Sequence, residues 1–129
     1  MGQSQALIID DNSKNLSVLA RLLRTEGLTS IQLTHSSGLE AALEQAEKLA
    51  VIFLDLELPG DDGFALLTRL KSDPRTQSLP VIAYTVHVSE INVAHRHGFD
   101  GFIGKPLDSE KFPEQLERIL RGDPVWETP

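Results

Sequence analysis

Polar residues of three kinds stand at, or one residue beyond, the ends of short apolar runs in this chain. They are three carboxylates, one hydroxyl and one amine: Asp10, Asp11, Asp55, Thr85 and Lys105. Each has an ordinary explanation by itself, such as a helix cap, a turn residue or a solvated lysine. If the apolar runs are neighbouring parallel strands, however, these side chains converge at the edge of the sheet where ligands bind.

The set as a whole favours phosphoryl chemistry. Three carboxylates in one cleft repel one another, and a divalent cation removes that repulsion. Carboxylate ligands without His or Cys favour Mg²⁺, with Mn²⁺ as the alternative ion. The lysine supplies a positive charge for a phosphoryl group, and the hydroxyl supplies a hydrogen bond. A carboxylate nucleophile beside these groups predicts phosphoryl transfer onto an aspartate.

Short apolar runs predict the strands that would carry these residues. Four runs are continuous and suit strands buried on both faces: Ala6–Ile9, Val51–Leu54, Val81–Tyr84 and Phe102–Ile103. Residues 30–34 alternate between polar and apolar side chains, which suits a half-exposed edge strand.

Helix-periodic segments lie between these runs. Four of them repeat apolar residues every three or four positions, beginning at Leu16, Leu39, Phe64 and Phe112. The segment Ser89–Gly98 keeps this period only weakly, so we expect a short, loosely packed helix there. Strands that alternate with helices predict a doubly wound parallel α/β sheet with helices on both faces.

Composition limits the class of protein. The 129 residues fit one domain. The formal net charge of −7 argues against direct nucleic-acid binding, because phosphate backbones require a basic face. The absence of cysteine excludes disulfides and thiolate metal sites. We find neither an apolar run of membrane-span length nor a signal-peptide pattern, and therefore expect a cytoplasmic protein without a membrane segment.

We expect two parts, a domain over residues 1–121 and a flexible tail over 122–129. Gly122 and Pro124 stop the last helix. Trp126 either packs on the body of the domain or begins a linker, and we favour the linker.

Four motifs, in order and at these spacings, make the chain similar to a known family. They are residues 7–12 (LIIDDN), 52–60 (IFLDLELPG), 79–85 (LPVIAYT) and 101–106 (GFIGKP). Over residues 5–121 the chain resembles the receiver domain of response regulators in bacterial two-component systems, of which the chemotaxis regulators are one kind. The resemblance implies a flavodoxin-like fold with a five-stranded parallel sheet of order 2-1-3-4-5.

The resemblance also implies roles at the site. Asp55 would be the phosphoacceptor, and Lys105 would pair with the phosphoryl oxygens. Mg²⁺ would be held directly by Asp11, by Asp55 and by the backbone carbonyl of Glu57. Asp10 would act on the ion through water.

A switch is implied as well. Thr85 would be the switch hydroxyl, and Phe102 the switch aromatic that turns inward. A sensor histidine kinase or a phosphotransfer protein would donate the phosphoryl group. The face of the fourth helix, fifth strand and fifth helix would then bind a downstream protein. The chain would be a switch that promotes its own phosphorylation and dephosphorylation, and not a dedicated enzyme.

Two other functions compete with this interpretation. A phosphohydrolase of the haloacid dehalogenase type uses similar residues, but its nucleophile comes first and its acidic pair last, whereas Asp10 and Asp11 come first here. That family also places a second Asp two residues beyond the nucleophile, where this chain has Glu57. The other alternative is a receiver that docks partners without phosphorylation, and the complete residue set argues against it.

Three residues bear on access to the site. The family usually has a small residue after the switch hydroxyl, and this chain has Val86. Its stiff branched side chain either narrows the approach for donor and water or only packs. Glu57 and His87 would lie at the rim and, if they meet, would close it further. A narrowed site predicts slow labelling by small donors and a long-lived phosphoryl group.

Overall fold

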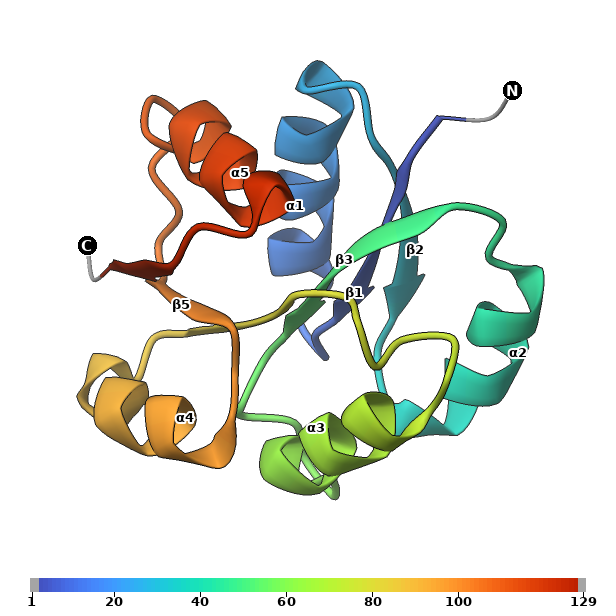
Figure 1. Cartoon of the computed structure of the whole chain (residues 1–129). Coiled ribbons are helices and arrows are strands. Elements are labelled where there is room, and N and C mark those ends of the chain that lie inside the picture. Colours follow the sequence, from blue (N-terminus) through green and yellow to red (C-terminus); the bar gives the residue numbers. More distant parts are fainter. Residues whose placement is uncertain (1–2, 128–129) are drawn as a thin grey trace.

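Buried apolar runs form a parallel sheet in the computed structural model, which describes residues 3–127 (Figure 1). In chain order the strands are β1 (Gln5–Ile9), β2 (Thr29–Leu33), β3 (Leu49–Leu54), β4 (Val81–Thr85), β5 (Gly101–Gly104) and β6 (Val125–Glu127). They pair in the order β2-β1-β3-β4-β5-β6, and every pair is parallel. The expected order of the first five strands is confirmed.

Five α-helices connect and cover the strands. They are α1 (Ser13–Thr25), α2 (Leu39–Gln45), α3 (Gly63–Ser72), α4 (Ile91–His97) and α5 (Phe112–Arg121). Single 3₁₀ turns, η1 (Ser36–Gly38) and η2 (Val88–Glu90), precede α2 and α4. The short helix expected within residues 89–98 is confirmed as α4, which buries only Ala94 and ends at Gly98 in the left-handed conformation.

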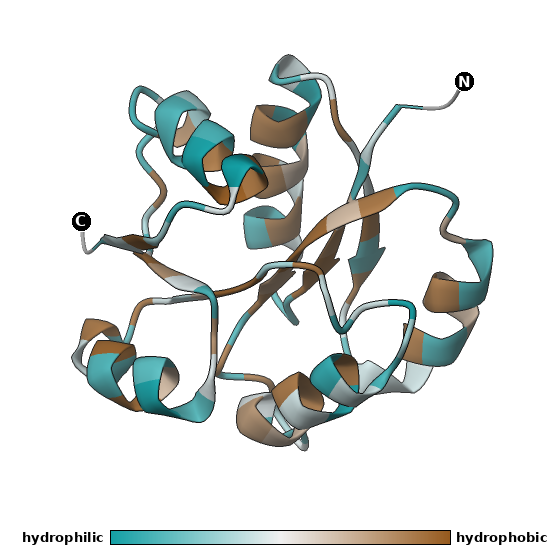
Figure 2. Cartoon of the chain, in the orientation of Figure 1, coloured by the Kyte–Doolittle hydropathy of each residue, from teal (hydrophilic) through white to brown (hydrophobic). Residues whose placement is uncertain are grey.

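The helices form two layers with the sheet between them. Figure 1 shows α1 and α5 on one face and α2, α3 and α4 on the other. Alternate residues of each inner strand enter opposite cores: in β1, Ala6 and Ile8 pack with α1 and α5, whereas Leu7 and Ile9 pack with the other layer. Figure 2 shows the apolar strands and the apolar helix faces turned toward them. Burial on both faces holds the strand ends in fixed relative positions.

Side-chain caps fix two loops at the carboxyl ends of the strands. The Asn12 Oδ1 atom accepts hydrogen bonds from the N–H groups of Lys14 and Asn15, at 2.9 and 3.1 Å, and so begins α1. The Asp62 Oδ1 atom accepts from the Phe64 N–H at 2.9 Å and begins α3. Such caps satisfy amides that have no partner within the helix. They therefore set where the chain turns after β1 and after the loop that follows β3.

The structure differs from the sequence expectation at the last described residues. Five strands and a flexible tail were expected, but Val125–Glu127 form a sixth strand on β5, and Trp126 packs on the domain instead of beginning a linker. The reason is burial: Val125 is completely buried and Trp126 is half-buried, which the loop signals before them do not reveal. A division of the chain at residue 121 stays a prediction, and residues 1–2 and 128–129 of the two expected parts lie outside the described range.

Within residues 3–127, no helix has both the length and the apolar character needed to cross a membrane.

Candidate functional site

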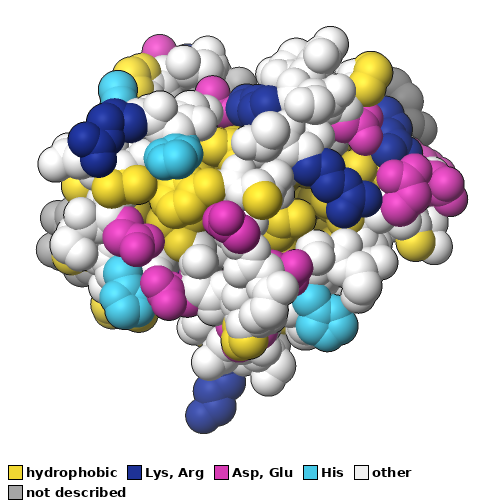
Figure 3. Space-filling view, turned by 90° about the horizontal axis from the view of Figure 1, so that it is seen from below, with side chains coloured by type: hydrophobic (Ala, Val, Ile, Leu, Met, Phe, Trp, Pro, Cys, Tyr) yellow, Lys and Arg dark blue, Asp and Glu magenta, His cyan; other side chains and the backbone are white. Residues whose placement is uncertain are grey.

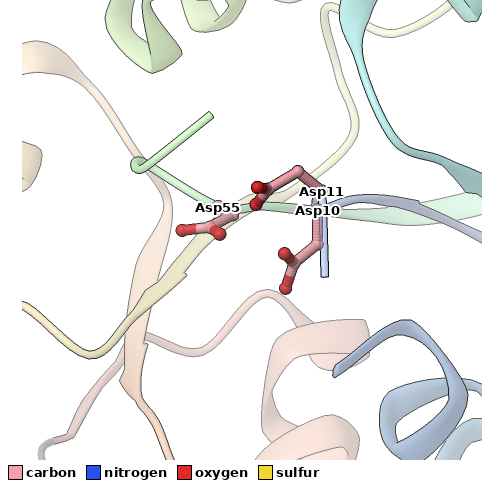
Figure 4. Close-up of side chains that lie close together, drawn as sticks. All are labelled: Asp10, Asp11 and Asp55. Carbon is pink, nitrogen blue, oxygen red and sulfur yellow. The ribbon is translucent and has the colours of Figure 1, made fainter. Parts of the chain in front are cut away.

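Three carboxylates meet where β1 and β3 end. Asp10, Asp11 and Asp55 each place one carboxylate oxygen so that the three atoms lie within 4.8 Å of one another. Backbone hydrogen bonds from Asp10 N–H to Leu33 and from Asp55 N–H to Ile9, at 3.0 and 2.9 Å, extend the sheet to these residues. Figure 4 shows the Asp10 and Asp11 side chains leaving the backbone in opposite directions, as consecutive residues of an extended chain do.

Asp10 forms the inner side of the cluster. It is completely buried, and its Oδ1 atom accepts a hydrogen bond from the Asn12 N–H at 2.9 Å. Its Oδ2 atom accepts from the Tyr84 hydroxyl at 2.7 Å and from Lys105 Nζ at 2.8 Å. Burying a carboxylate costs several kcal/mol unless such partners replace water. Both oxygens of Asp10 are therefore engaged by the protein itself.

Lys105 links Asp10 to Asp55. Its amine lies 2.8 Å from Asp10 Oδ2 and 3.3 Å from Asp55 Oδ2, and its side chain is 8% exposed. The ammonium also stands 4.3 Å from the centre of the Tyr84 ring, a favourable cation–π distance. The Lys105 N–H donates to the Thr85 carbonyl at 2.9 Å, which continues the β4–β5 pairing to the residue that carries the amine.

The two buried carboxylates have opposite electrostatic character. Burial raises the pKa of Asp55 to about 6, although the Glu57 N–H and the charge of Lys105 favour its ionised form. Burial acts in the same direction on Asp10, but hydrogen bonds from Lys105, Asn12 and Tyr84 outweigh it and lower the pKa of that carboxyl. Asp10 is therefore stably ionised, whereas the negative charge of Asp55 is only partly compensated by the groups around it.

Thr85 lies at the strand end where it was expected, whereas Phe102, expected to turn inward on phosphorylation, is buried already. Thr85 is completely buried at the end of β4, and its hydroxyl oxygen accepts a hydrogen bond from the His87 N–H at 3.1 Å. Accepting that bond leaves the hydroxyl proton to donate. Phe102 is already completely buried, with Ala83 as its Cα partner on β4 and Trp126 on β6. Their roles as switch hydroxyl and switch aromatic stay predictions.

Three exposed residues form the rim. Val86 is 61% exposed, so it does not pack into the core. The Glu57 and His87 side chains do meet, with 3.6 Å between Oε1 and Nε2, and each is about half exposed. The Glu57 N–H donates to Asp55 Oδ1 at 3.0 Å, which places this residue beside the cluster. The metal-binding role expected for its carbonyl, and the effect of the rim on access, stay predictions.

The cluster suits a hard divalent cation. All three side chains offer oxygen, and three carboxylates face one lysine, so negative charge is left uncompensated. Asp11 is exposed, which leaves this side of the cluster open to solvent, whereas Asp10 is engaged by the protein. Oxygen ligands, few carboxylates and room for water are the conditions that Mg²⁺ prefers.

Tyr84 is a site residue that sequence reasoning missed. The apolar run Val81–Tyr84 predicts only a buried strand residue at this position, yet the Tyr84 hydroxyl binds Asp10, which lies 74 positions earlier in the chain. Burial and this hydrogen bond raise the pKa of Tyr84 well above its usual range, so the phenol remains a donor. The residue type could have indicated this contact, because a tyrosine in a strand buried on both faces needs a polar partner for its hydroxyl.

Comparisons with known proteins agree with this geometry. The model of the response regulator receiver domain matches residues 6–117. The chain is 28% identical to protein PilH of Pseudomonas aeruginosa over 92% of its length and 99% of that protein's. It is 35% identical to stress response regulator protein 1 of Meyerozyma guilliermondii, and the match covers 84% of this chain but only 51% of that protein.

A solved structure shows the same fold. The N-terminal receiver domain of a two-component response regulator from Bacteroides fragilis superposes with a TM-score of 0.76 and 26% identity. The match covers 94% of this chain and 97% of that domain. The family match spans most of the chain, including all three carboxylates, and we conclude that this protein belongs to the response regulator receiver domain family.

Proposed function

We propose that Asp55 is the residue through which this receiver domain, a signalling switch, takes up its phosphoryl group. One observation carries the assignment: of the two buried carboxylates, Asp55 is the one whose charge is less compensated, and it lies between the amine of Lys105 and the open, Asp11 side of the cluster. Asp10, by contrast, already has both oxygens occupied by hydrogen bonds.

The transfer step follows from these positions. An Asp55 carboxylate oxygen attacks the phosphorus of a phosphohistidine on a sensor kinase or a phosphotransfer protein. The P–O bond forms as the P–N bond breaks, and the electron pair of that bond stays on the imidazole nitrogen. Lys105 lies 3.3 Å from Asp55 Oδ2 and can follow the charge onto the phosphoryl oxygens. Burial excludes competing water from the nucleophile.

Asp11, Asp55 and the Glu57 carbonyl would hold Mg²⁺ or Mn²⁺ directly, and Asp10 through water. When bound, the ion supplies charge neutralisation for the transferred group. The chain's own residues do the rest: Lys105 and Tyr84 hold Asp10 in place, and the Glu57 N–H orients the nucleophilic carboxylate.

The product adds a charge of about −1.5 to −2 next to Thr85. The Thr85 hydroxyl then donates to the new phosphoryl oxygens, which draws the end of β4 toward Asp55. Because β4 pairs with β5 and leads through η2 into α4, the change passes to Phe102 and α4. A downstream protein would bind the surface that α4, β5 and α5 form together, the α4–β5–α5 surface.

Charge distribution supports a protein partner and not a nucleic acid. Figure 3 shows acidic, basic and histidine side chains interspersed around a hydrophobic patch, on the face that lies at the bottom of Figure 1. A direct nucleic-acid binder presents a basic stripe, and the net charge here is −7.

The assignment of Asp55 is tested by mass spectrometry after incubation with acetyl phosphate and Mg²⁺. The wild-type chain should gain one phosphoryl group, and Asp55→Asn should gain none, because an amide is not a nucleophile. Asp62→Asn is the matched control, since asparagine also caps a helix and this variant should label normally. Undiminished labelling of Asp55→Asn would refute the assignment.

The same experiment separates the alternatives. A receiver that only docks partners would leave the wild-type chain unlabelled. A phosphohydrolase would turn over a small phosphate ester many times, which a switch does not.

A further inference from the structure

The outer edge of β5 already carries a strand of this chain. β6 lies parallel to β5, with Gly101 opposite Val125, Phe102 opposite Trp126 and Ile103 opposite Glu127. Figure 1 shows it at the end of the sheet next to β5. The surface at which the proposed function places a downstream protein therefore has an occupant, the segment Val125–Glu127.

Two apolar side chains hold β6 on opposite faces of the sheet. Val125 is completely buried in the core that α1 and α5 cover. Trp126 packs against the other core, and its ring centre lies 4.6 Å from that of His95 on α4. β6 thus contacts both helices that flank β5, and it covers the strand edge between them.

The third anchor is polar and weak. Glu127 accepts hydrogen bonds from Gln115 Nε2 at 2.7 Å and from Arg118 Nη1 at 3.1 Å, but its side chain is 36% exposed. A partly exposed ion pair of this kind adds little stability. The Gln115 Oε1 atom is buried without a hydrogen-bond partner among the described residues, and a cavity of about 310 Å³ remains beside Glu127. Segments held by few contacts can open locally while the rest of a domain stays folded.

The elements that β6 contacts are those that the switch would move. Phe102 lies between β4 and Trp126, with Ala83 as its partner on one side. α4, which contacts Trp126 through His95, follows directly from Thr85 through η2. A displacement of Thr85 toward Asp55 therefore disturbs both Phe102 and His95, two residues beside which Trp126 lies.

We propose that residues 125–127 close the α4–β5–α5 surface at rest and leave it when Asp55 carries a phosphoryl group. The inference rests on the proposed role of Asp55. A protein that binds this surface competes with β6 for the edge of β5. Linkage makes the coupling reciprocal: if phosphoryl loading releases β6, then loosening β6 strengthens binding of a phosphoryl mimic.

Trp126 reports directly on this strand, because it is the chain's single tryptophan. Beryllofluoride with Mg²⁺ serves as the phosphoryl mimic, and ¹⁹F NMR of the bound fluorides shows whether the site is loaded. On loading, Trp126 emission should shift to the red and its quenching by acrylamide should rise severalfold. Asp55→Asn should show neither the bound ¹⁹F signal nor the change in emission.

Two variants test the reciprocal effect by ¹⁹F titration. Trp126→Ala removes the main apolar anchor. Gly101→Ala places a Cβ atom 2.8 Å from the Val125 carbonyl oxygen and 2.9 Å from the Ile82 Cδ1 atom. The end of the Ile82 side chain can turn aside, whereas relief at Val125 requires the backbone of β6 to move away. Both should bind beryllofluoride severalfold more tightly than the wild-type chain. Leu120→Ala, which shortens an exposed side chain of α5, should bind with unchanged affinity.

The outcomes separate the two proposals. A loaded wild-type site with unchanged Trp126 emission would overturn the release of β6 and leave the role of Asp55 standing. Affinity for beryllofluoride that is unaltered in both Trp126→Ala and Gly101→Ala would also overturn it. A wild-type chain that takes up no beryllofluoride would refute the role of Asp55, and the inference that rests on it would fail too.

Discussion

The inner side of the carboxylate cluster and its rim are built on different principles. On the inner side, Asp10 is completely buried and receives hydrogen bonds from Tyr84, Lys105 and Asn12. Each polar atom there has a partner within the protein, so this side changes little when a ligand arrives. The inner side is therefore rigid: it holds the negatively charged Asp10 carboxylate in place, with the Lys105 amine hydrogen-bonded to it.

The rim has the opposite character. Asp11 is exposed, Val86 is 61% exposed, and the Glu57 and His87 side chains approach to only 3.6 Å while remaining about half in solvent. The two sides therefore have different roles. The inner side supplies fixed charge and stability, and the rim controls the access of ligands to the cluster and their release from it. Substitutions should therefore affect folding on one side and rates or ion binding on the other.

The largest effect on stability should come from the ionisation of Asp55, which lies between the inner side and the rim. Its pKa is about 6 in the folded chain against an ordinary value of 3.8. Below pH 3.8 the carboxyl is protonated in both states; between 3.8 and 6 the unfolded chain releases the proton first, so stability falls as pH rises. Urea unfolding in a chelator should show that the Asp55 carboxyl contributes a loss of up to about 3 kcal/mol across this window, measured as the difference from Asp55→Asn.

Asp55→Asn should lack that loss and exceed the wild-type stability at pH 7, with the two chains nearly equal at pH 3.5. Equal slopes of stability against pH in the two chains would show that Asp55 is not the destabilised carboxylate.

Tyr84→Phe tests the inner side. It removes one donor from a completely buried carboxylate and leaves the aromatic packing in place, so we expect a loss of about 1 to 3 kcal/mol in unfolding free energy. Chemical denaturation at neutral pH measures it. A loss below half a kcal/mol, comparable with surface substitutions, would show that Lys105 and the Asn12 N–H satisfy Asp10 without the tyrosine.

Asp11→Ala tests the open side. Mg²⁺ at about ten times its dissociation constant should raise wild-type stability by about 1.4 kcal/mol, by binding only the folded state. The variant should lose most of this gain while remaining folded, because Asp11 is exposed. Melting temperatures with chelator and with Mg²⁺ provide the measurement, and a gain of equal size in both chains would place the ion elsewhere.

Val86→Ala should give the smallest effect on stability, within about 0.5 kcal/mol, because the side chain is exposed. If Val86 narrows the rim, the variant should be labelled faster by acetyl phosphate and should lose its phosphoryl group faster, with unchanged Mg²⁺ affinity. Single-turnover labelling and decay measure both rates. Rates equal to those of the wild-type chain would show that Val86 does not narrow the rim.

Sequence reasoning succeeded where the signal is local. Buried strands such as Val51–Leu54 show as continuous apolar runs, and a helix such as α1 shows as an apolar period followed by a glycine. The convergence of Asp10, Asp11 and Asp55 also followed, because parallel strands must end at the same edge of the sheet.

It failed where a contact depends on residues that are distant in sequence. Tyr84 has the composition of a core residue, and only the fold brings its hydroxyl to Asp10. β6 is three residues long, too short to show a period, and it follows Gly122 and Pro124, which favour a loop. Its stability comes from Phe102 and His95, which the local sequence of the tail cannot reveal.

The close approach of β6 to Gly101 has a consequence for sequence divergence. With the Val125 carbonyl oxygen 2.8 Å from where a Cβ atom would stand, position 101 admits no side chain while β6 is docked. The two positions should therefore vary together: homologues that keep an apolar–aromatic–acidic triplet at 125–127 should keep glycine at 101. Homologues without the triplet lose that constraint and keep only the contact with the end of the Ile82 side chain, 2.9 Å from the same Cβ position, so alanine should become more frequent there.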